Sequence, residues 1–193
     1  MRDIIKDEKK IISQAREGDK DAFKELVEAY QPQVARTIVG ILGPGPEAED
    51  VGQETFIKFY RSLSEFRGES SAGTYITRIA INLSLNVLRK RKISRKIFFG
   101  KKNTAQNQII SQENPGNTLE AEQLINRGLQ KIPQKFRTVL ILRYMNEHSV
   151  TETAEILSLP QGTVMSRVSR GMEKLKEILE PFYKDKNKGS EER

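Results

Sequence analysis

Residues 149–175, SVTETAEILSLPQGTVMSRVSRGMEKL, predict two short helices joined by a tight turn. Ser149 is a favourable N-cap, and Glu152 three residues later completes a capping box. Residues 158–160 end the first helix, and the second is expected from about residue 161 to residue 179. Apolar residues at three- and four-residue spacing predict the core-facing stripe of that second helix. The stripe consists of Val164, Val168, Met172, Leu175 and Leu179.

The opposite side of the second helix carries short polar and cationic side chains. At about 100° per residue, Thr163, Ser166 and Arg170 lie opposite the stripe, with Arg167 and Lys174 at its edge. Such a face is typical of a helix that lies in the DNA major groove. An ordinary helical hairpin with a solvated face is the alternative.

The composition limits the possible classes of protein. The 193 residues are 36% hydrophobic and carry a net charge of +7, which favours a polyanionic partner. The chain has no cysteine and a single histidine, His148, which excludes disulfides, thiol catalysis and a histidine-rich metal site. No long apolar run is present, so we expect a cytoplasmic protein without membrane insertion.

The positive charge is concentrated in one segment. Between residues 89 and 112 there are eight basic residues and no acidic one. Because the whole chain carries +7, the remainder sums to −1. This segment can contact a phosphate backbone and leaves the remaining surface free to bind protein.

The N-terminal half predicts three helices after a frayed lead-in of residues 1–18. The first begins at Asp19 and is kinked or split at Pro32. After the break at residues 43–46, the second spans residues 47–63, and the loop at residues 66–73 precedes a third helix that opens at Thr74. The second helix is expected to turn Phe56, Phe59, Tyr60 and Leu63 inward.

One face of the third helix bears an unusual row of side chains. The 100° spacing aligns Tyr75, Arg78, Asn82, Asn86 and Arg89 opposite the buried stripe. An amide can pair with a base edge, an aromatic ring can stack on an unstacked base and arginine can bind phosphate, so this row suits single-stranded or opened DNA. A solvated polar face is the alternative.

The C-terminal half predicts a linker and a second helical unit. The segment after residue 99 is rich in polar residues and predicts a flexible linker, and the Phe98 and Phe99 rings before it are expected to contact either a partner or the first domain. Helices are expected from residue 117 and over residues 134–145, and His148 is expected on the surface of the following turn. Pro181 is expected to end the last helix. The inward-facing side chains of these two helices are expected to be Leu119, Leu124, Ile125, Leu129, Phe136, Val139, Leu140, Leu142 and Tyr144.

Several short motifs in order resemble those of one family. They are residues 48–51 (AEDV), 53–56 (QETF), 66–68 (FRG), 74–76 (TYI), 78–80 (RIA) with Asn82, a basic stretch, residues 132–133 (IP), and residues 162–164 (GTV) with Ser166 and Arg167. Together, from about residue 19 to residue 179, they resemble the extracytoplasmic-function (ECF) group of bacterial RNA polymerase sigma factors.

The resemblance implies an all-α chain of two small helical domains. Residues 1–18 would be a lead-in, residues 19–93 sigma region 2, residues 94–117 a flexible basic linker, residues 118–183 the helix-turn-helix of region 4, and residues 184–193 a disordered tail. The implied function is promoter-specific transcription initiation through the −10 and −35 elements. The implied partners are core RNA polymerase, promoter DNA and an anti-sigma factor, with no cofactor and no metal.

The resemblance also assigns expected roles to residues. Polymerase binding is expected at Asp50, Gln53 and Glu54. Binding of the −10 element is expected at Phe66, Gly68, Tyr75, Arg78, Asn82, Asn86 and Arg89. Binding of the −35 element is expected at Gln161, Thr163, Ser166, Arg167, Arg170 and Lys174.

The chain departs from the family where Tyr75 replaces a usual tryptophan and where Met165 and Met172 replace frequently basic residues. A stand-alone helix-turn-helix regulator that binds duplex DNA as a dimer is the alternative, although it gives the Asn82 row no role. An enzyme is disfavoured because the acidic residues near Glu47 form a helix's first turn and His148 has no Ser or Cys partner pattern.

Overall fold

The computed structural model describes residues 7–68, 70–99 and 117–188, and every regular element in these ranges is helical. The sequence-based prediction of an all-α chain is therefore confirmed. In chain order the elements are α1 (Glu8–Arg16), α2 (Lys20–Leu42), α3 (Pro46–Ser62), the 3-10 turn η1 (Leu63–Glu65), α4 (Ala72–Phe99), α5 (Asn117–Lys131), α6 (Gln134–Leu140), the π-helical turn η2 (Ile141–Met145), α7 (Val150–Leu157) and α8 (Gln161–Lys188).

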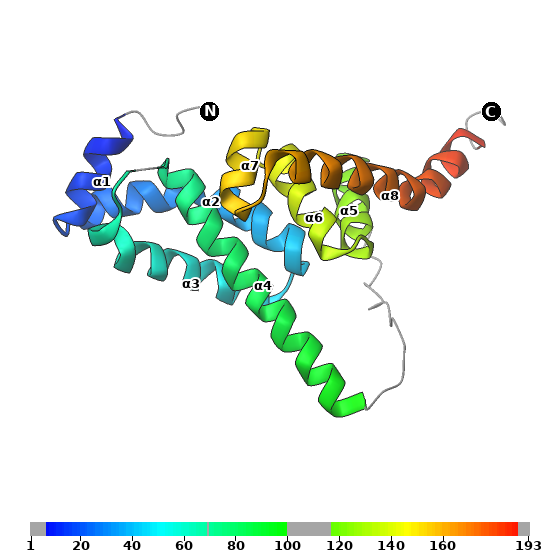
Figure 1. The fold of residues 1–193 in the computed structure, drawn as a ribbon, viewed down its shortest axis with the longest axis horizontal. Coiled ribbons are helices and arrows are strands. Elements are labelled where there is room, and N and C mark those ends of the chain that lie inside the picture. Colours follow the sequence, from blue (N-terminus) through cyan, green and yellow to red (C-terminus); the bar gives the residue numbers. More distant parts are fainter. Residues whose placement is uncertain (1–6, 69, 100–116, 189–193) are drawn as a thin grey trace.

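Helix α2 is the centre of the N-terminal half, and α1, α3 and α4 pack around it (Figure 1). Asp19 caps α2 by accepting hydrogen bonds from the backbone N–H groups of Asp21 and Ala22. The expectation of a frayed N-terminal lead-in is wrong for α1, because Ile11, Ile12 and Ala15 are buried against the core. The apolar pattern of this short helix was too weak to predict that one of its faces packs against the core.

Both internal prolines lie within continuous helices. Pro32 does not split α2, and Pro181 does not end α8, which continues to Lys188 beyond the expected domain end at residue 183. Both proline side chains are exposed. Water can therefore reach the carbonyl groups that lose an intrahelical partner, so the helices continue past them.

The expected capping box at the start of α7 is confirmed. The Ser149 hydroxyl accepts a hydrogen bond from the Glu152 N–H at 3.1 Å, and the Glu152 carboxylate accepts one from the Ser149 N–H at 2.7 Å. Burial alone would raise the pKa of Glu152, but the hydrogen bonds with Ser149, together with nearby positive charge, lower the pKa overall.

Close packing between α8 and α6 changes the expected stripe of α8. Gly171 is buried, and a Cβ at this position would lie 3.1 Å from Leu140 Cγ. Met172 is turned outward and is 42% exposed, so its expected place in the core is wrong. Glycine permits a closer approach of two helices than a larger residue would, so Gly171 takes the place expected for Met172, while Val164, Val168, Leu175 and Leu179 keep the expected face.

Three more side chains expected in the core are exposed. They are Tyr60, Ile125 and Tyr144. Tyr60 contacts Phe23 edge to face at a centroid distance of 4.8 Å, on the outer side of the aromatic cluster. Tyr144 lies in η2, whose wider π-helical turn replaces the end of the expected 134–145 helix and displaces the side chains that follow.

Helix α4 continues further than expected. It runs through Phe99, so residues 94–99 of the expected linker are helical, and its C-terminal turns project from the body of the molecule (Figure 1). The rest of the expected linker up to residue 116 and the last five residues of the expected tail lie outside the described residues, as does the side chain of Leu119.

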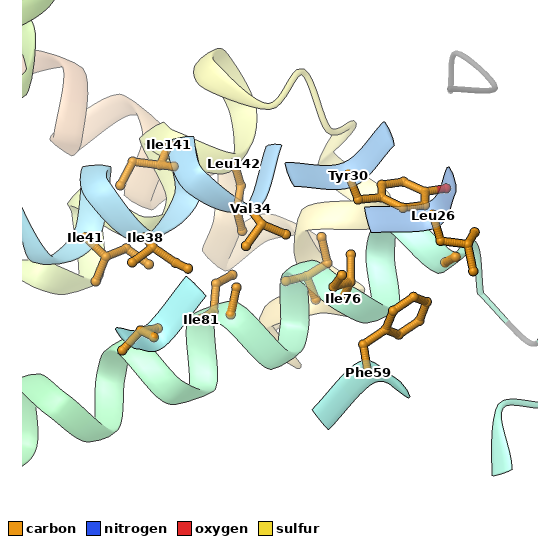
Figure 2. Packing of buried hydrophobic residues seen from close by; sticks show 14 of the residues in the cluster. Leu26, Tyr30, Val34, Ile38, Ile41, Phe59, Ile76, Ile81, Ile141 and Leu142 are labelled. Carbon is orange, nitrogen blue, oxygen red and sulfur yellow. The ribbon is translucent and has the colours of Figure 1, made fainter. Parts of the chain in front are cut away.

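The two halves share a continuous hydrophobic core. Ile141 and Leu142 of η2 are fully buried beside Val34 and Ile38 of α2 (Figure 2). Gly40 makes this contact possible, since a Cβ there would lie 2.9 Å from Ile141 Cγ1. The C-terminal half is therefore docked on the N-terminal half, an arrangement that the sequence alone did not predict.

Candidate nucleic-acid interface

The predicted row on α4 is only partly free. Asn82, Asn86 and Arg89 are exposed, whereas Tyr75 and Arg78 are partly buried. The Asn86 carboxamide oxygen accepts a hydrogen bond from Arg89 Nη1 at 2.7 Å. Asn82 makes none of the side-chain hydrogen bonds found among the described residues, so its amide is available to a base edge.

A hollow of about 260 Å³ lies at the N-terminal end of this row. Phe66 and Tyr75 form part of its wall, and their ring centroids are 5.1 Å apart. Among the described residues, the lining consists of Glu65, Phe66, Arg67, Ser70, Tyr75, Arg78 and Glu155. Gly68, which has φ +71, is exposed at the turn of the same loop. The structure thus brings the loop, Tyr75 and Arg78 together as expected, with Asn82 one helical turn beyond Arg78.

Arg16 of α1 holds the loop that forms this wall. Its guanidinium donates to the backbone carbonyl of Leu63 at 3.0 Å and to that of Phe66. Phe66 is buried, so these bonds fix the backbone on which its ring stands. Arg16 precedes the predicted domain and had no sequence signal for this role.

Helix α7 of the C-terminal half closes one side of the hollow. Arg78 Nη2 donates to the Glu155 carbonyl at 3.0 Å and lies 3.7 Å from the Glu155 carboxylate. Arg78 Nε is buried without a hydrogen-bond partner. The guanidinium is thus held by one of its nitrogens and leaves a donor unsatisfied.

A second polar contact between the halves is centred on His148. This residue is 5% exposed, so the expectation of a surface histidine is wrong. Gln33 Nε2 lies 2.7 Å from Thr77 Oγ1 and 3.4 Å from His148 Nε2, where a neutral imidazole accepts the bond. Burial lowers the pKa of His148, nearby Arg143 lowers it further, and Glu152 opposes both.

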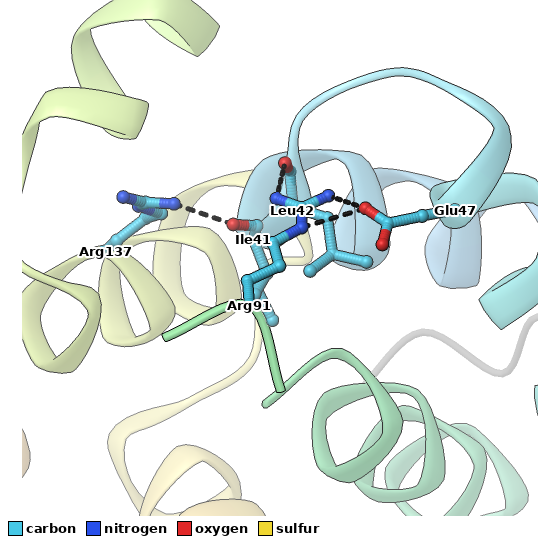
Figure 3. Close-up of polar contacts among 5 residues, drawn as sticks. All are labelled: Ile41, Leu42, Glu47, Arg91 and Arg137. Atoms are coloured by element: carbon cyan, nitrogen blue, oxygen red, sulfur yellow. Dashed lines mark hydrogen bonds and ion pairs between the residues drawn. The ribbon is translucent and has the colours of Figure 1, made fainter. Parts of the chain in front are cut away.

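A third contact involves the buried guanidinium of Arg137. Its Nη1 donates to the Ile41 carbonyl at the end of α2 at 2.6 Å, across the boundary between the halves (Figure 3). Further bonds to Gln130 and the Ile132 carbonyl satisfy the remaining Nη donors. Burial lowers the pKa of Arg137 to about 10, so the residue stays charged at neutral pH.

Arg91 of the basic segment is held against the N-terminal half. Arg91 donates to the Glu47 carboxylate and to the Leu42 carbonyl, so it caps the end of α2 (Figure 3). Arg89, Lys90 and Lys92 remain exposed on the projecting part of α4. The described basic surface is therefore slightly smaller than the sequence suggests.

The N-terminal turns of α8 present the predicted polar face. Gln161, Ser166 and Arg170 are exposed, and Thr163, Arg167 and Lys174 are half-buried at its edges. Gln161 Nε2 donates to Thr151 Oγ1 at 3.3 Å, which ties α8 to α7. Met165 is 61% exposed beside this face. The arrangement of α7 and α8 matches a helix-turn-helix with its second helix free.

The predicted polymerase-binding residues share the surface of α3. Asp50 and Gln53 are exposed, and the half-buried Glu54 has its carboxylate 3.8 Å from Lys58 Nζ. Within the described residues, no group of three or more acidic or histidine side chains could hold a metal ion. No described helix is both long and apolar enough to cross a bilayer.

Comparisons with known proteins agree with this geometry. The family Sigma-70 region 2 matches residues 26–93, and Sigma-70, region 4 matches residues 128–177. The chain is 35% identical to the ECF RNA polymerase sigma factor SigW of Bacillus subtilis, over 89% of this chain and 96% of that protein. The chain belongs to the ECF family of RNA polymerase sigma factors. This ECF sigma factor is a promoter-specific transcription initiation factor.

Other relatives support the same assignment. The RNA polymerase sigma-H factor of Pseudomonas aeruginosa is 34% identical to this ECF sigma factor, over 92% of this chain and 96% of its own length. The solved structure of CnrH in complex with the cytosolic domain of CnrY has the same fold, with a TM-score of 0.67 and 23% identity over 89% of this chain and 96% of that chain. RpoE of Bartonella quintana, solved with the anti-sigma factor NepR, also has a TM-score of 0.67 and 23% sequence identity, over 82% of this chain and 96% of that chain.

Proposed function

We propose that the two halves of the chain divide promoter recognition between them. The α4 row and the adjacent hollow bind the non-paired strand of the −10 element, and the free face of α8 reads the −35 element in the major groove. The hollow supports this proposal, because it places the Phe66 and Tyr75 rings beside the Arg78 guanidinium, and the free Asn82 amide lies one helical turn from Arg78. Rings, a cation and an amide are the groups that hold an extruded base and its phosphate.

The division also gives α3 a role. Its exposed Asp50 and Gln53 and the neighbouring Glu54 are proposed to bind core RNA polymerase. DNA opening then results from binding alone, without a catalytic step, since capture of a base offsets the few kcal/mol needed to unpair it. We also propose that the protein is cytoplasmic and that promoter DNA is a partner. By analogy with the NepR complex of RpoE, we propose that an anti-sigma factor controls it.

Transcription of genomic DNA tests this function without a known promoter. Core polymerase is incubated with total DNA of the source bacterium, with and without this chain, and the RNA 5′ ends are mapped. We expect a set of chain-dependent 5′ ends that share one motif near −10 and another near −35. Absence of such RNAs, together with tight binding of a specific duplex by the chain alone, would instead support a stand-alone repressor.

A further inference from the structure

Met165 of α8 is an apolar side chain that the fold leaves uncovered. It is 61% exposed, and no large hydrophobic side chain among the described residues is more exposed. It lies outside the hydrophobic cluster, whereas the preceding Val164 is fully buried. We propose that Met165 reads the C5-methyl group of a thymine in the −35 element and is a specificity-determining residue. The proposal rests on the proposed function of α8 and names a base that this helix selects.

Met165 lies in the part of α8 that can reach base edges. The helix begins at Gln161, so Met165 belongs to its second turn. At about 100° per residue, Met165 lies between the buried Val164 and the exposed Ser166. Its side chain therefore stands at the edge of the free face and not against the core. The N-terminal residues of a recognition helix are the ones that contact bases in the major groove.

The charge around Met165 favours DNA as the occupant. Residues 161–172 contain Arg167 and Arg170 and no acidic residue. Phosphates on either side of the major groove match these cations, and the thymine methyl is the apolar group that a base pair presents inside the groove. Methionine is unbranched, flexible and polarizable, so its thioether can reach along the groove to such a methyl group. An apolar side chain between cations therefore fits the major groove.

Ser166, next to Met165, supplies a matching polar group. Its hydroxyl donates to the Thr163 carbonyl at 3.0 Å, so its lone pairs remain available as acceptors. In the major groove an A·T pair presents the thymine methyl group and the adenine amino group, which is a donor. An apolar side chain and an acceptor on consecutive residues match these two groups. A G·C pair also offers an amino donor but has no methyl group, so Met165 is the residue that distinguishes the two pairs.

The spacing along α8 predicts where the thymine lies. Met165 and Arg170 are five residues apart in the sequence, which corresponds to about 7.5 Å along the helix axis. Neighbouring base pairs are about 3.4 Å apart. The thymine is therefore expected about two or three base pairs from the position that Arg170 contacts.

Uracil tests the contact, because it differs from thymine only in lacking the C5-methyl group. The full chain is assembled with core RNA polymerase, and its affinity is measured for a promoter duplex mapped with the wild-type chain. Each thymine of the −35 element, on either strand, is replaced singly by uracil. Burial of one methyl group corresponds to about a fourfold change in affinity. We expect a loss of about this size at one thymine for the wild-type chain and no loss there for Met165→Ala.

Met172→Ala is the matched control, since Met172 is also exposed but lies about two turns further along α8. This variant should respond to uracil as the wild-type chain does. The ratio of the thymine and uracil affinities should be the same at low and high salt, because a methyl contact releases no counterion. A ratio that disappears at high salt would contradict an apolar contact.

Three other outcomes would overturn the proposal. The first is equal wild-type affinity for every thymine and uracil duplex, and the second is the same loss with uracil in Met165→Ala. The third is a gain from 5-methylcytosine at a cytosine of the element without any loss from uracil, which would assign the contact to a methylated cytosine. A scrambled −35 element tests the proposed function separately, because unchanged affinity for that duplex would show that α8 reads no element and would overturn both proposals.

Discussion

Replacement of Asn82 by alanine tests the proposed base contact most directly. The side chain is exposed and makes no side-chain hydrogen bond among the described residues, so its removal should change the free energy of unfolding by less than about 0.5 kcal/mol. A bidentate amide–base contact is worth about 1–3 kcal/mol, so promoter opening should weaken about 5- to 150-fold. Affinity for core polymerase should stay the same, because the residues that we propose to bind polymerase lie on α3 and Asn82 lies on α4.

Two measurements separate these effects. Permanganate reactivity of unpaired thymines reports promoter opening, and anisotropy of labelled protein reports core binding. Gln31→Ala is a matched control, since it removes an exposed amide from α2 outside the proposed site. An abasic site at the captured position should weaken opening by wild-type protein and add no further loss for Asn82→Ala. Normal opening by Asn82→Ala, or lost core affinity, would refute the assignment.

Three further predictions address other parts of the chain. Arg170→Ala should weaken initiation by about 1–3 kcal/mol at promoters that depend on their −35 element, and an unchanged promoter profile would show that Arg170 reads no base. Arg16→Met removes charged hydrogen bonds to two carbonyls and should lower stability by about 1.5–3 kcal/mol in thermal unfolding, whereas an unchanged melting temperature would contradict that role. Because burial lowers the pKa of His148, the undocked imidazole binds protons more readily, so docking should weaken as pH falls below about 6.5. Energy transfer between labelled halves should show this opening, and His148→Gln should abolish its pH dependence.

Features that depend on neighbouring residues could be predicted from the sequence. The capping box of Ser149 and Glu152 needs only a three-residue spacing, and the α4 row needs only helical periodicity. Both follow from the order of nearby residues alone. The same local information located the free face of α8.

Features that depend on distant residues could not be predicted. His148 is buried where it meets Gln33 of the other half, which also bonds Thr77, and no pattern near residue 148 reports this partner. Met172 faces outward because Gly171 packs against Leu140. Docking of the halves depends on tertiary contacts of this kind, so the contact of Arg78 with Glu155 could not be predicted either.

The π-helical turn η2 makes docking sensitive to a single insertion or deletion. Its wider ring is closed by the bond from Asn146 N–H to the Ile141 carbonyl at 3.0 Å. Loss of one residue there would rotate the following chain by about 100° and shift it by about 1.5 Å. Asn146 and His148 would leave their partners on α2, while α7 and α8 would keep their own geometry. One codon can thus change the docking of the halves without altering either helix that we propose to read DNA.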